Sequence, residues 1–313
     1  MIPFLGREHV EQAVSPERAL EAVREAFVAY ARGEWTMPPK VYVPAYPDGD
    51  FRAMPALGGG HALLKWVTSF PGNPARGLPT VTGLVLVSDA SNGMLKAVLD
   101  AGAVTALRTG AAAVLAAETL GRRGAETAAV IGVGVNGRAA ARTFAARGRI
   151  RRLLLWDVDP ARAAAVAEEL GAEVAQSREE ALAPDLLVTV TPGHEVVLGE
   201  GALRPGQHAS LMGADGPGKA EIAIGELARV RVFCDDWEQA SHNGDVVHGV
   251  EAGVLTRDDV TQLGDVLTGH ARGRQSDEEA TVFDSTGLAI QDLAIALAAL
   301  ERFEELAAPA IEL

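Results

Sequence analysis

Two basic residues lie in apolar surroundings, and their types suggest acid–base chemistry on a small anion. Lys65 lies in the strand-like run HALLKWVTS, where a period of two places it on one face with Leu63 and Val67. Arg108 lies in the apolar run AVTALRTGAAAVLAAETL. Burial lowers the pKa of a lysine, and a buried guanidinium requires an anion, so the pair predicts a proton-transferring lysine and a carboxylate-binding arginine. The alternatives are an edge-strand lysine that reaches water and an arginine paired with an internal acid.

Two further charged residues are weaker candidates. Asp215, in MGADGPGK, directly follows the apolar strand HASLM. Ligands of open α/β sheets bind beyond the carboxyl ends of the strands, so Asp215 is a candidate proton carrier, although Asp-Gly is also a turn signal. Arg52, in FRAMP, would by itself be an ordinary surface residue. His242 and His248 lack the spacing of a helical ligand pair, and no metal site is expected.

The most specific motif is a glycine loop between a strand and a helix. The apolar run AAVI precedes it, and RAAARTFAARG follows it. Asp157 ends the next strand, LLLWD, about twenty residues after the last glycine, as the dinucleotide fingerprint requires. The helix N-terminus would offer free N–H groups to a pyrophosphate, and Asp157 would bind ribose hydroxyls and repel a 2′-phosphate. The loop therefore predicts NAD rather than NADP, bound by Gly132, Gly134, Val135, Asn136, Gly137 and Asp157.

The elements that must position these residues fall into two groups. Before residue 88 the chain has a capped amphipathic helix after Ser15 and then short β-rich runs, which indicate a mixed or antiparallel sheet. After residue 119 strands and helices alternate, which indicates a parallel sheet. We therefore expect an α/β fold, with a Rossmann NAD-binding domain over 119–286 and a β-rich domain over 1–118. A long apolar helix within 287–313 would return to this first domain.

Composition limits the partners. The formal net charge is −14, from 28 Lys+Arg and 42 Asp+Glu, which disfavours nucleic acid and anionic membranes. The apolar windows near 97–120 carry charged residues, and the N-terminus shows no signal-peptide pattern, so we expect a cytoplasmic protein. The single cysteine, Cys234, lies in a strand-like run and is expected to be buried.

The sequence resembles the ornithine cyclodeaminase/μ-crystallin family over nearly its whole length. The similar runs include MPPKVYV, FRAMPAL, LKWVTSFPGNPARGLPT, ALRTGAA, IGVGVNG, GADGPGK, DDWEQA and FDSTGLAIQD. Within the family, these runs resemble those of archaeal-type alanine dehydrogenases in particular. The resemblance implies a Rossmann domain, a β-rich domain that also forms a homodimer, and an amino-acid or 2-oxo-acid substrate.

The resemblance also assigns roles to residues. Lys65 matches the active-site lysine, Arg108 the arginine that holds the substrate carboxylate, and Asp215 the acid–base aspartate of cyclodeaminases. Lys40 falls near a second carboxylate-binding position. Arg52 stands where cyclodeaminases are expected to carry an acid for a second substrate amine, which favours a short amino acid. The cofactor site would be completed by Thr191 and Ser285.

The expected activity is reversible oxidative deamination of L-alanine to pyruvate and ammonia, with NAD accepting hydride. Arg108 and Arg52 would anchor the carboxylate, and holding the substrate beside the nicotinamide is a large part of such catalysis. Lys65 would polarise the developing carbonyl and relay protons, and Asp215 would assist the attacking water. Three alternatives remain: ornithine cyclodeamination to proline and ammonia with NAD recycled, reduction of cyclic ketimines, and ligand binding without turnover as in μ-crystallin-like proteins.

Overall fold

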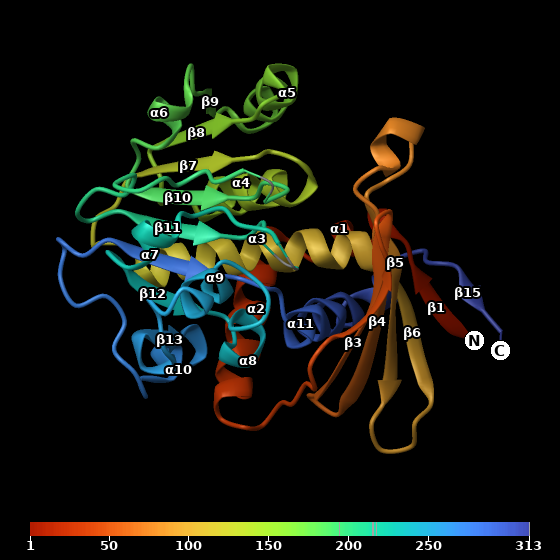
Figure 1. The fold of residues 1–313 in the computed structure, drawn as a ribbon. Helices are drawn as coiled ribbons and strands as arrows, with labels where there is room; N and C mark the ends of the chain where they lie inside the picture. The colour runs from red at the N-terminus through yellow and green to blue at the C-terminus, as the bar shows by residue number, and fades with distance from the viewer. Residues whose placement is uncertain (194, 215, 217, 313) are drawn as a thin grey trace. The chain divides into compact units, whose positions relative to one another are not determined.

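The computed structural model describes residues 1–193, 195–214, 216 and 218–312. The chain divides into two compact units. Unit 1 comprises Met1–Arg108 with Leu288–Leu313, and unit 2 comprises Thr109–Gly287 (Figure 1). The division falls within helix α3 (Ala101–Leu120), closer to its start than the expected boundary after residue 118.

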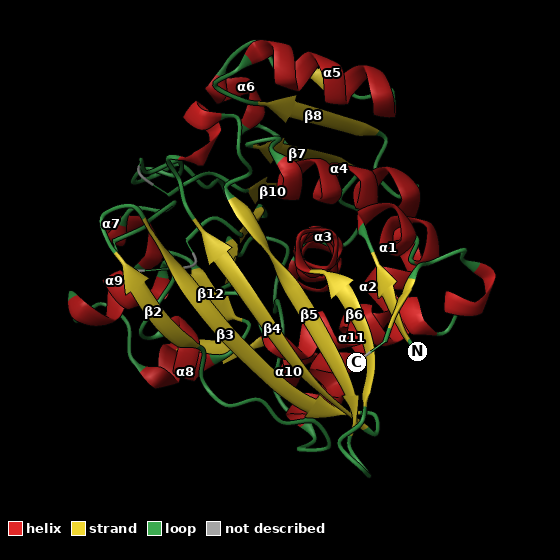
Figure 2. Cartoon of the chain, turned by 90° about the vertical axis from the view of Figure 1, so that its right-hand side faces the viewer, coloured by secondary structure: helices red, strands yellow, loops and turns green. Residues whose placement is uncertain are grey.

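Unit 1 contains a seven-stranded sheet in the order β15-β1-β6-β5-β4-β3-β2. Strands β2 to β6 are antiparallel to their neighbours, whereas β1 runs parallel to β6 and antiparallel to β15, so the sheet is mixed. Figure 2 shows the broad sheet, with helix α11 (Ala289–Leu300) of the same unit behind it. The strands are β1 (Ile2–Leu5), β2 (Val41–Ala45), β3 (Gly49–Gly58), β4 (His61–Ser69), β5 (Val81–Asp89), β6 (Leu95–Asp100) and β15 (Ala310–Ile311).

The two faces of this sheet differ. Along β4, Leu63, Lys65 and Val67 are buried, whereas the intervening Leu64 and Trp66 are exposed. Strand β4 pairs with β3 and with β5, so Lys65 lies in the interior of the sheet and is not an edge-strand lysine. The buried face packs against helix α11 (Ala289–Leu300), which also contacts helix α2 (Pro16–Ala31).

The helices of unit 1 follow the apolar pattern of the sequence. The Ser15 hydroxyl accepts a hydrogen bond from the Arg18 amide at the start of α2, which buries Leu20, Val23 and Phe27. The short helix α1 (Arg7–Ala13) precedes it. Helix α11 is shorter than the run GLAIQDLAIALAALERFEELA suggested, because the apolar residues stop at Leu300 and the charged segment after it has no buried face to continue. A short 3₁₀ turn, Phe303–Glu305, follows.

Unit 2 contains an eight-stranded sheet in the order β13-β12-β14-β11-β10-β7-β8-β9. Every pairing in it is parallel, as the alternation of strands and helices predicted. The run TVFD, which sequence patterning did not identify as a strand, forms the central β14. The strands are β7 (Thr127–Ile131), β8 (Arg152–Trp156), β9 (Glu173–Val174), β10 (Leu186–Thr189), β11 (His208–Leu211), β12 (Arg231–Cys234), β13 (Val260–Gln262) and β14 (Thr281–Asp284).

Helix α3 enters unit 2 at Thr109 and precedes its first strand. It is long and apolar enough to cross a membrane by length and composition, but 72% of its most apolar window is buried within the protein, as in a core helix. The other helices are α4 (Val135–Arg147), α5 (Pro160–Leu170), α6 (Arg178–Ala181), α7 (Ile224–Leu227), α8 (Trp237–Ala240), α9 (Val246–Glu251) and α10 (Leu263–Thr268).

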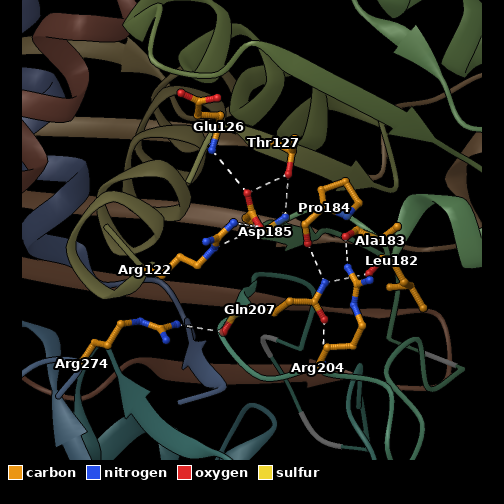
Figure 3. A network of polar contacts seen from close by, with 10 residues as sticks. All are labelled: Arg122, Glu126, Thr127, Leu182, Ala183, Pro184, Asp185, Arg204, Gln207 and Arg274. Atoms are coloured by element: carbon orange, nitrogen blue, oxygen red, sulfur yellow. Dashed lines mark hydrogen bonds and ion pairs between the residues drawn. The ribbon is translucent and has the colours of Figure 1, made fainter. Parts of the chain in front are cut away.

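Polar contacts tie together the loops where the strands of unit 2 begin (Figure 3). The Asp185 carboxylate, just before β10, accepts hydrogen bonds from Arg122 at 2.8 Å and from the Thr127 hydroxyl at 3.0 Å. The Gln207 amide donates to the Pro184 carbonyl at 2.6 Å, and Arg274 donates to the Gln207 carbonyl at 2.9 Å. These hydrogen bonds hold together the loops at the amino ends of the strands, whereas ligand-binding loops of open α/β sheets are expected at the carboxyl ends.

Candidate active site

The glycine loop adopts the strand–loop–helix geometry that its sequence predicted. It lies between β7 and α4, and Gly132 has a φ of +88°, which favours glycine. A Cβ on Gly137 would lie 1.9 Å from the Gly132 carbonyl oxygen, so close packing requires glycine there. A Cβ on Gly134 would meet nothing within 4 Å. Protein packing thus does not explain Gly134, and the open space beside it fits the close approach of a ligand.

The loop presents backbone donors at the start of α4. Gly134 is the N-cap residue and makes no side-chain capping bond. Val135, the first helical residue, is 62% exposed although it is apolar, and Asn136 follows it. The free N–H groups and the positive end of the helix dipole make this helix start a suitable site for a pyrophosphate.

Asp157 follows β8 and is almost fully buried. One carboxylate oxygen accepts the Val133 amide at 2.8 Å, and the other accepts the Asp159 amide at 2.9 Å. Arg162 Nη1 also donates to both oxygens, at 3.1 and 3.3 Å, so ribose hydroxyls would bind this carboxylate in place of the half-exposed guanidinium. Sequence reasoning missed Arg162, whose guanidinium lies 3.1 Å from this carboxylate although its side chain is 50% exposed.

Buried acids organise the loops after β10, β11 and β14. Glu221 accepts the Thr191 amide and hydroxyl, both at 2.7 Å, and the Gly213 amide at 2.7 Å. Asp235 accepts the Ser285 hydroxyl at 3.3 Å. Thr191 and Ser285 therefore follow β10 and β14, at the edge where the glycine loop follows β7. Asp215 lies outside the described residues.

Three of the buried carboxylates in unit 2 have raised pKa values. Burial raises the pKa of Glu221. Burial, reinforced by the charge of Glu221, raises the pKa of Asp245 to about 7. Burial, together with Asp245, raises the pKa of Asp284 well above its usual value. Asp245 in turn accepts the Glu221 amide at 2.6 Å, so the carboxylates form one connected group behind the loops. At neutral pH a substantial fraction of Asp245 is therefore protonated.

Unit 1 brings Lys65 and Arg108 to one carboxylate. Lys65 is 1% exposed, and its Nζ lies 2.7 Å from Oδ2 of Asp292 and 3.3 Å from the Thr105 hydroxyl oxygen. Burial lowers the pKa of Lys65 to about 8, against the attraction of Asp292. A substantial fraction of this lysine is therefore neutral near pH 8 and able to accept a proton.

The Arg108 guanidinium has N–H groups that make no hydrogen bond within the described part of unit 1. Its Nε is buried and lies 3.7 Å from Oδ1 of Asp292, too far for a hydrogen bond. Its side chain is 13% exposed. The guanidinium is thus held by charge and has fork-like N–H groups available for an anion such as a carboxylate.

Arg52 is buried on the same face of the sheet. Register places Met54 opposite Lys65 and Arg52 opposite Val67, so the two basic residues are diagonal neighbours. The Asp50 carboxylate holds Arg52 at 2.6 Å. Arg52 is therefore not the ordinary surface residue that its local sequence suggested. Lys40 directly precedes β2, whose first residue pairs with β3 one position after Arg52.

Asp292 is the residue of this cluster that sequence reasoning missed. It lies in the first turn of α11 and is 0% exposed. A signal was present, because an acid within the otherwise apolar run GLAIQDLAIALAAL requires a buried cation. The sequence alone could not identify which cation, since Lys65 and Asp292 are far apart along the chain.

The remaining candidates from the sequence are one cysteine and two histidines. Cys234 is buried, as expected. His248 Nε2 lies 2.7 Å from the Lys219 carbonyl oxygen, and His242 contacts the Glu238 carbonyl. Among the described residues, no group of three or more His, Cys, Asp or Glu residues could hold a metal ion. A cavity of about 910 Å³ in unit 2 contains none of the predicted site residues; segments such as Arg122–Ala125, before β7, line it.

Comparisons with known proteins agree with this arrangement. The family model described as the ornithine cyclodeaminase/mu-crystallin family matches residues 3–306. An alanine dehydrogenase of Archaeoglobus fulgidus is 42% identical over 94% of this chain and 92% of its own. An ornithine cyclodeaminase of Agrobacterium tumefaciens is 34% identical over 78% of this chain and 70% of its own. The solved structure of an archaeal alanine dehydrogenase dimer with bound NAD is 40% identical, with a TM-score of 0.93 over 99% of both chains.

The parallel sheet, the glycine loop and the acid after β8 define a Rossmann-type protein with a second, β-rich unit. The chain belongs to the ornithine cyclodeaminase/mu-crystallin family.

Proposed function

We propose that the protein is an NAD-dependent amino-acid dehydrogenase that interconverts L-alanine and pyruvate plus ammonia. The observation that carries the proposal is the buried Lys65, whose pKa is lowered to about 8 by burial and by the nearby charges of Arg108 and Arg52. The 42% identity with the Archaeoglobus fulgidus alanine dehydrogenase supports the same activity.

The proposed cofactor site uses the loop residues Gly132, Gly134, Val135, Asn136 and Gly137. Backbone N–H groups at the start of α4 would hold the pyrophosphate, and the open space at Gly134 supports this assignment. Asp157 would bind the ribose hydroxyls, and Thr191 and Ser285 follow strands at the same edge of the sheet. When bound, NAD would accept hydride from the substrate.

The proposed substrate site uses the cations of unit 1. Arg108 would bind the substrate carboxylate through its unused donors, with Arg52 and Lys40 adding positive charge. Neutral Lys65 would accept a proton during deamination and return it as the carbonyl forms. Asp215 would assist the attacking water. Arg52 also disfavours a second substrate amine, because like charges repel, so a short monocarboxylic amino acid is the expected substrate.

We further propose a homodimer formed through the outer face of the unit 1 sheet. Exposed apolar side chains gather on this face, and Phe51 stacks on Trp66 with ring centroids 5.7 Å apart. Such a face usually marks a protein–protein interface. The solved archaeal alanine dehydrogenase is itself described as a dimer. The exposed residues include Val41, Val43, Leu57, Leu64, Trp66 and Leu84.

A single pair of assays tests the proposed activity. Purified protein is mixed with NAD and L-alanine, and the absorbance of NADH is followed over time. L-Ornithine is supplied in parallel, and ammonia is measured. NADH accumulation with alanine supports the dehydrogenase. Ammonia from ornithine without net NADH would instead identify a cyclodeaminase, the activity of the relative that is 34% identical.

A further inference from the structure

The buried face of the unit 1 sheet carries more charge than its apolar surroundings can hold without compensation. Lys65, Arg52 and Asp292 are each less than a tenth exposed, and Arg108 is only slightly more exposed. Oδ1 of Asp50 pairs with Nε of Arg52 at 2.6 Å. Asp292 therefore has to compensate both Lys65 and Arg108, and it lies within ion-pair distance of each.

Two features of the fold suit an acid at position 292. The Lys65 ammonium lies 2.7 Å away, and Asp292 lies in the first turn of α11, where the helix dipole stabilises an anion. Burying an acid in an apolar helix has a large desolvation cost, which the attraction of Lys65 and Arg108 offsets. The shorter of the two ion pairs, with Lys65, couples this acid to the chemistry of the lysine.

The contacts of Lys65 also fix the direction of its amine. A tetrahedral neutral amine has two N–H bonds and one lone pair. The geometry assigns Asp292 as the positioning residue of Lys65: its Oδ2 forms an ion pair with Nζ at 2.7 Å, and Nζ donates to the Thr105 hydroxyl at 3.3 Å, so these two oxygens hold the nitrogen in place while the lone pair of the neutral amine takes up a proton. This inference rests on the proposed role of Lys65 as a proton acceptor.

Asp292 also sets the charge balance around the amine. The groups that face Lys65 are Asp292 on α11, Arg108 and Thr105 on α3, and Arg52 on β3 with its partner Asp50. Burial, Arg108 and Arg52 lower the pKa of Lys65, whereas Asp292 raises it. Without the carboxylate of Asp292, the Lys65 amine would be neutral over a wider pH range. It would also be a weaker base, and its nitrogen would be held less firmly in the orientation needed to accept a proton.

The test measures the titration of Lys65 directly. Full-length wild-type protein and the variants D292N and D292E are treated briefly with acetic anhydride over a range of pH, and acetylation of Lys65 is quantified by mass spectrometry. The pH profile of kcat/KM is recorded in parallel. D100N serves as the control, because Asp100 caps α3 by accepting the Ala103 amide at 2.6 Å but does not pair with Lys65.

We expect the labelling midpoint of Lys65 to fall by about one pH unit or more in D292N, because an attractive charge at short range is lost. The acidic limb of kcat/KM should move by the same amount. In D292E the charge returns and the midpoint should stay near 8, while kcat remains at least tenfold low because the longer side chain misdirects the amine. D100N should leave the midpoint and kcat unchanged.

An unchanged midpoint in D292N would overturn the electrostatic part of the inference. Wild-type kcat in D292E would overturn the positioning part, even if D292N fails to fold. Because labelling requires no turnover, a shifted midpoint in a protein inactive on alanine would support the role of Asp292 while refuting the proposed substrate.

Discussion

Replacing Asp157 with serine should change the cofactor preference from NAD toward NADP. The Asp157 carboxylate would bind the ribose hydroxyls, and a charge-assisted hydrogen bond contributes about 1.5–3 kcal/mol. Its loss should therefore reduce kcat/KM for NAD by roughly 10- to 150-fold. NADP should gain, because repulsion between a carboxylate and a phosphate dianion about 4 Å apart is about 2 kcal/mol even in water, or roughly 30-fold.

Arg162 should strengthen this change. Its guanidinium now lies 3.1 Å from the Asp157 carboxylate, and its side chain is 50% exposed, so in D157S it is released beside the 2′-phosphate. The preference ratio, kcat/KM for NADP over that for NAD, should rise by roughly 300- to 5,000-fold when both effects combine. The double variant D157S/R162Q should lose part of the gain for NADP.

The assay records initial rates with each cofactor and dissociation constants by protein fluorescence. Asp157 also accepts the Val133 amide, so urea unfolding is measured to separate local destabilisation from cofactor recognition. Equal losses for NAD and NADP in folded D157S would refute the reasoning, since they would mean that Asp157 acts only as a structural acceptor for the glycine loop.

Three further predictions concern other positions. K65M should abolish turnover but preserve NAD affinity, and it should lower the unfolding free energy by about 3–5 kcal/mol in urea titrations because the buried Asp292 loses its shorter ion pair and keeps only Arg108 at 3.7 Å; measurable turnover would contradict the role of Lys65. G137A should lower thermal stability because its Cβ would meet a backbone oxygen, whereas G134A should retain stability but weaken NAD binding at least tenfold in calorimetry; equal behaviour of both would argue against a cofactor at the loop. The pKa of Asp245 is raised to about 7 by burial and a neighbouring acid, so the folded state binds the extra proton and its contribution to stability is lost as pH rises from about 4 through 7; D245N should flatten that decline in unfolding experiments.

Much of the fold could be predicted from local pattern. The alternation of apolar runs identified the parallel sheet, and the glycines at 132 and 137 identified the turn between β7 and α4, because their chemistry is local. The strand β14 was missed since TVFD is short and buried on both sides, which leaves no alternation to detect.

The candidate site was less predictable, because its partners are distant in sequence. Lys65 and Arg108 were identified as charges in apolar runs, but their shared counter-ion Asp292 required the packing of α11 on the sheet. Arg52 resembled a surface residue until the β3–β4 register placed it on the face of Lys65. Arg162 was missed because a helical turn, and not adjacency, brings it to Asp157.

The side chains of strand β4 alternate between two faces with different roles. Leu63, Lys65 and Val67 lie on the buried face, whereas Leu64 and Trp66 lie on the outer face. Inserting or deleting a single residue would exchange the buried and exposed sets of side chains and could place Trp66 at the buried position of the lysine. A shift of two residues would keep each set on its own face. Strand β4 can therefore change by substitution on either face but not by gain or loss of a single residue. A substitution that alters association through the outer face, at Leu64 or Trp66, is directly next to the reactive Lys65 in the chain.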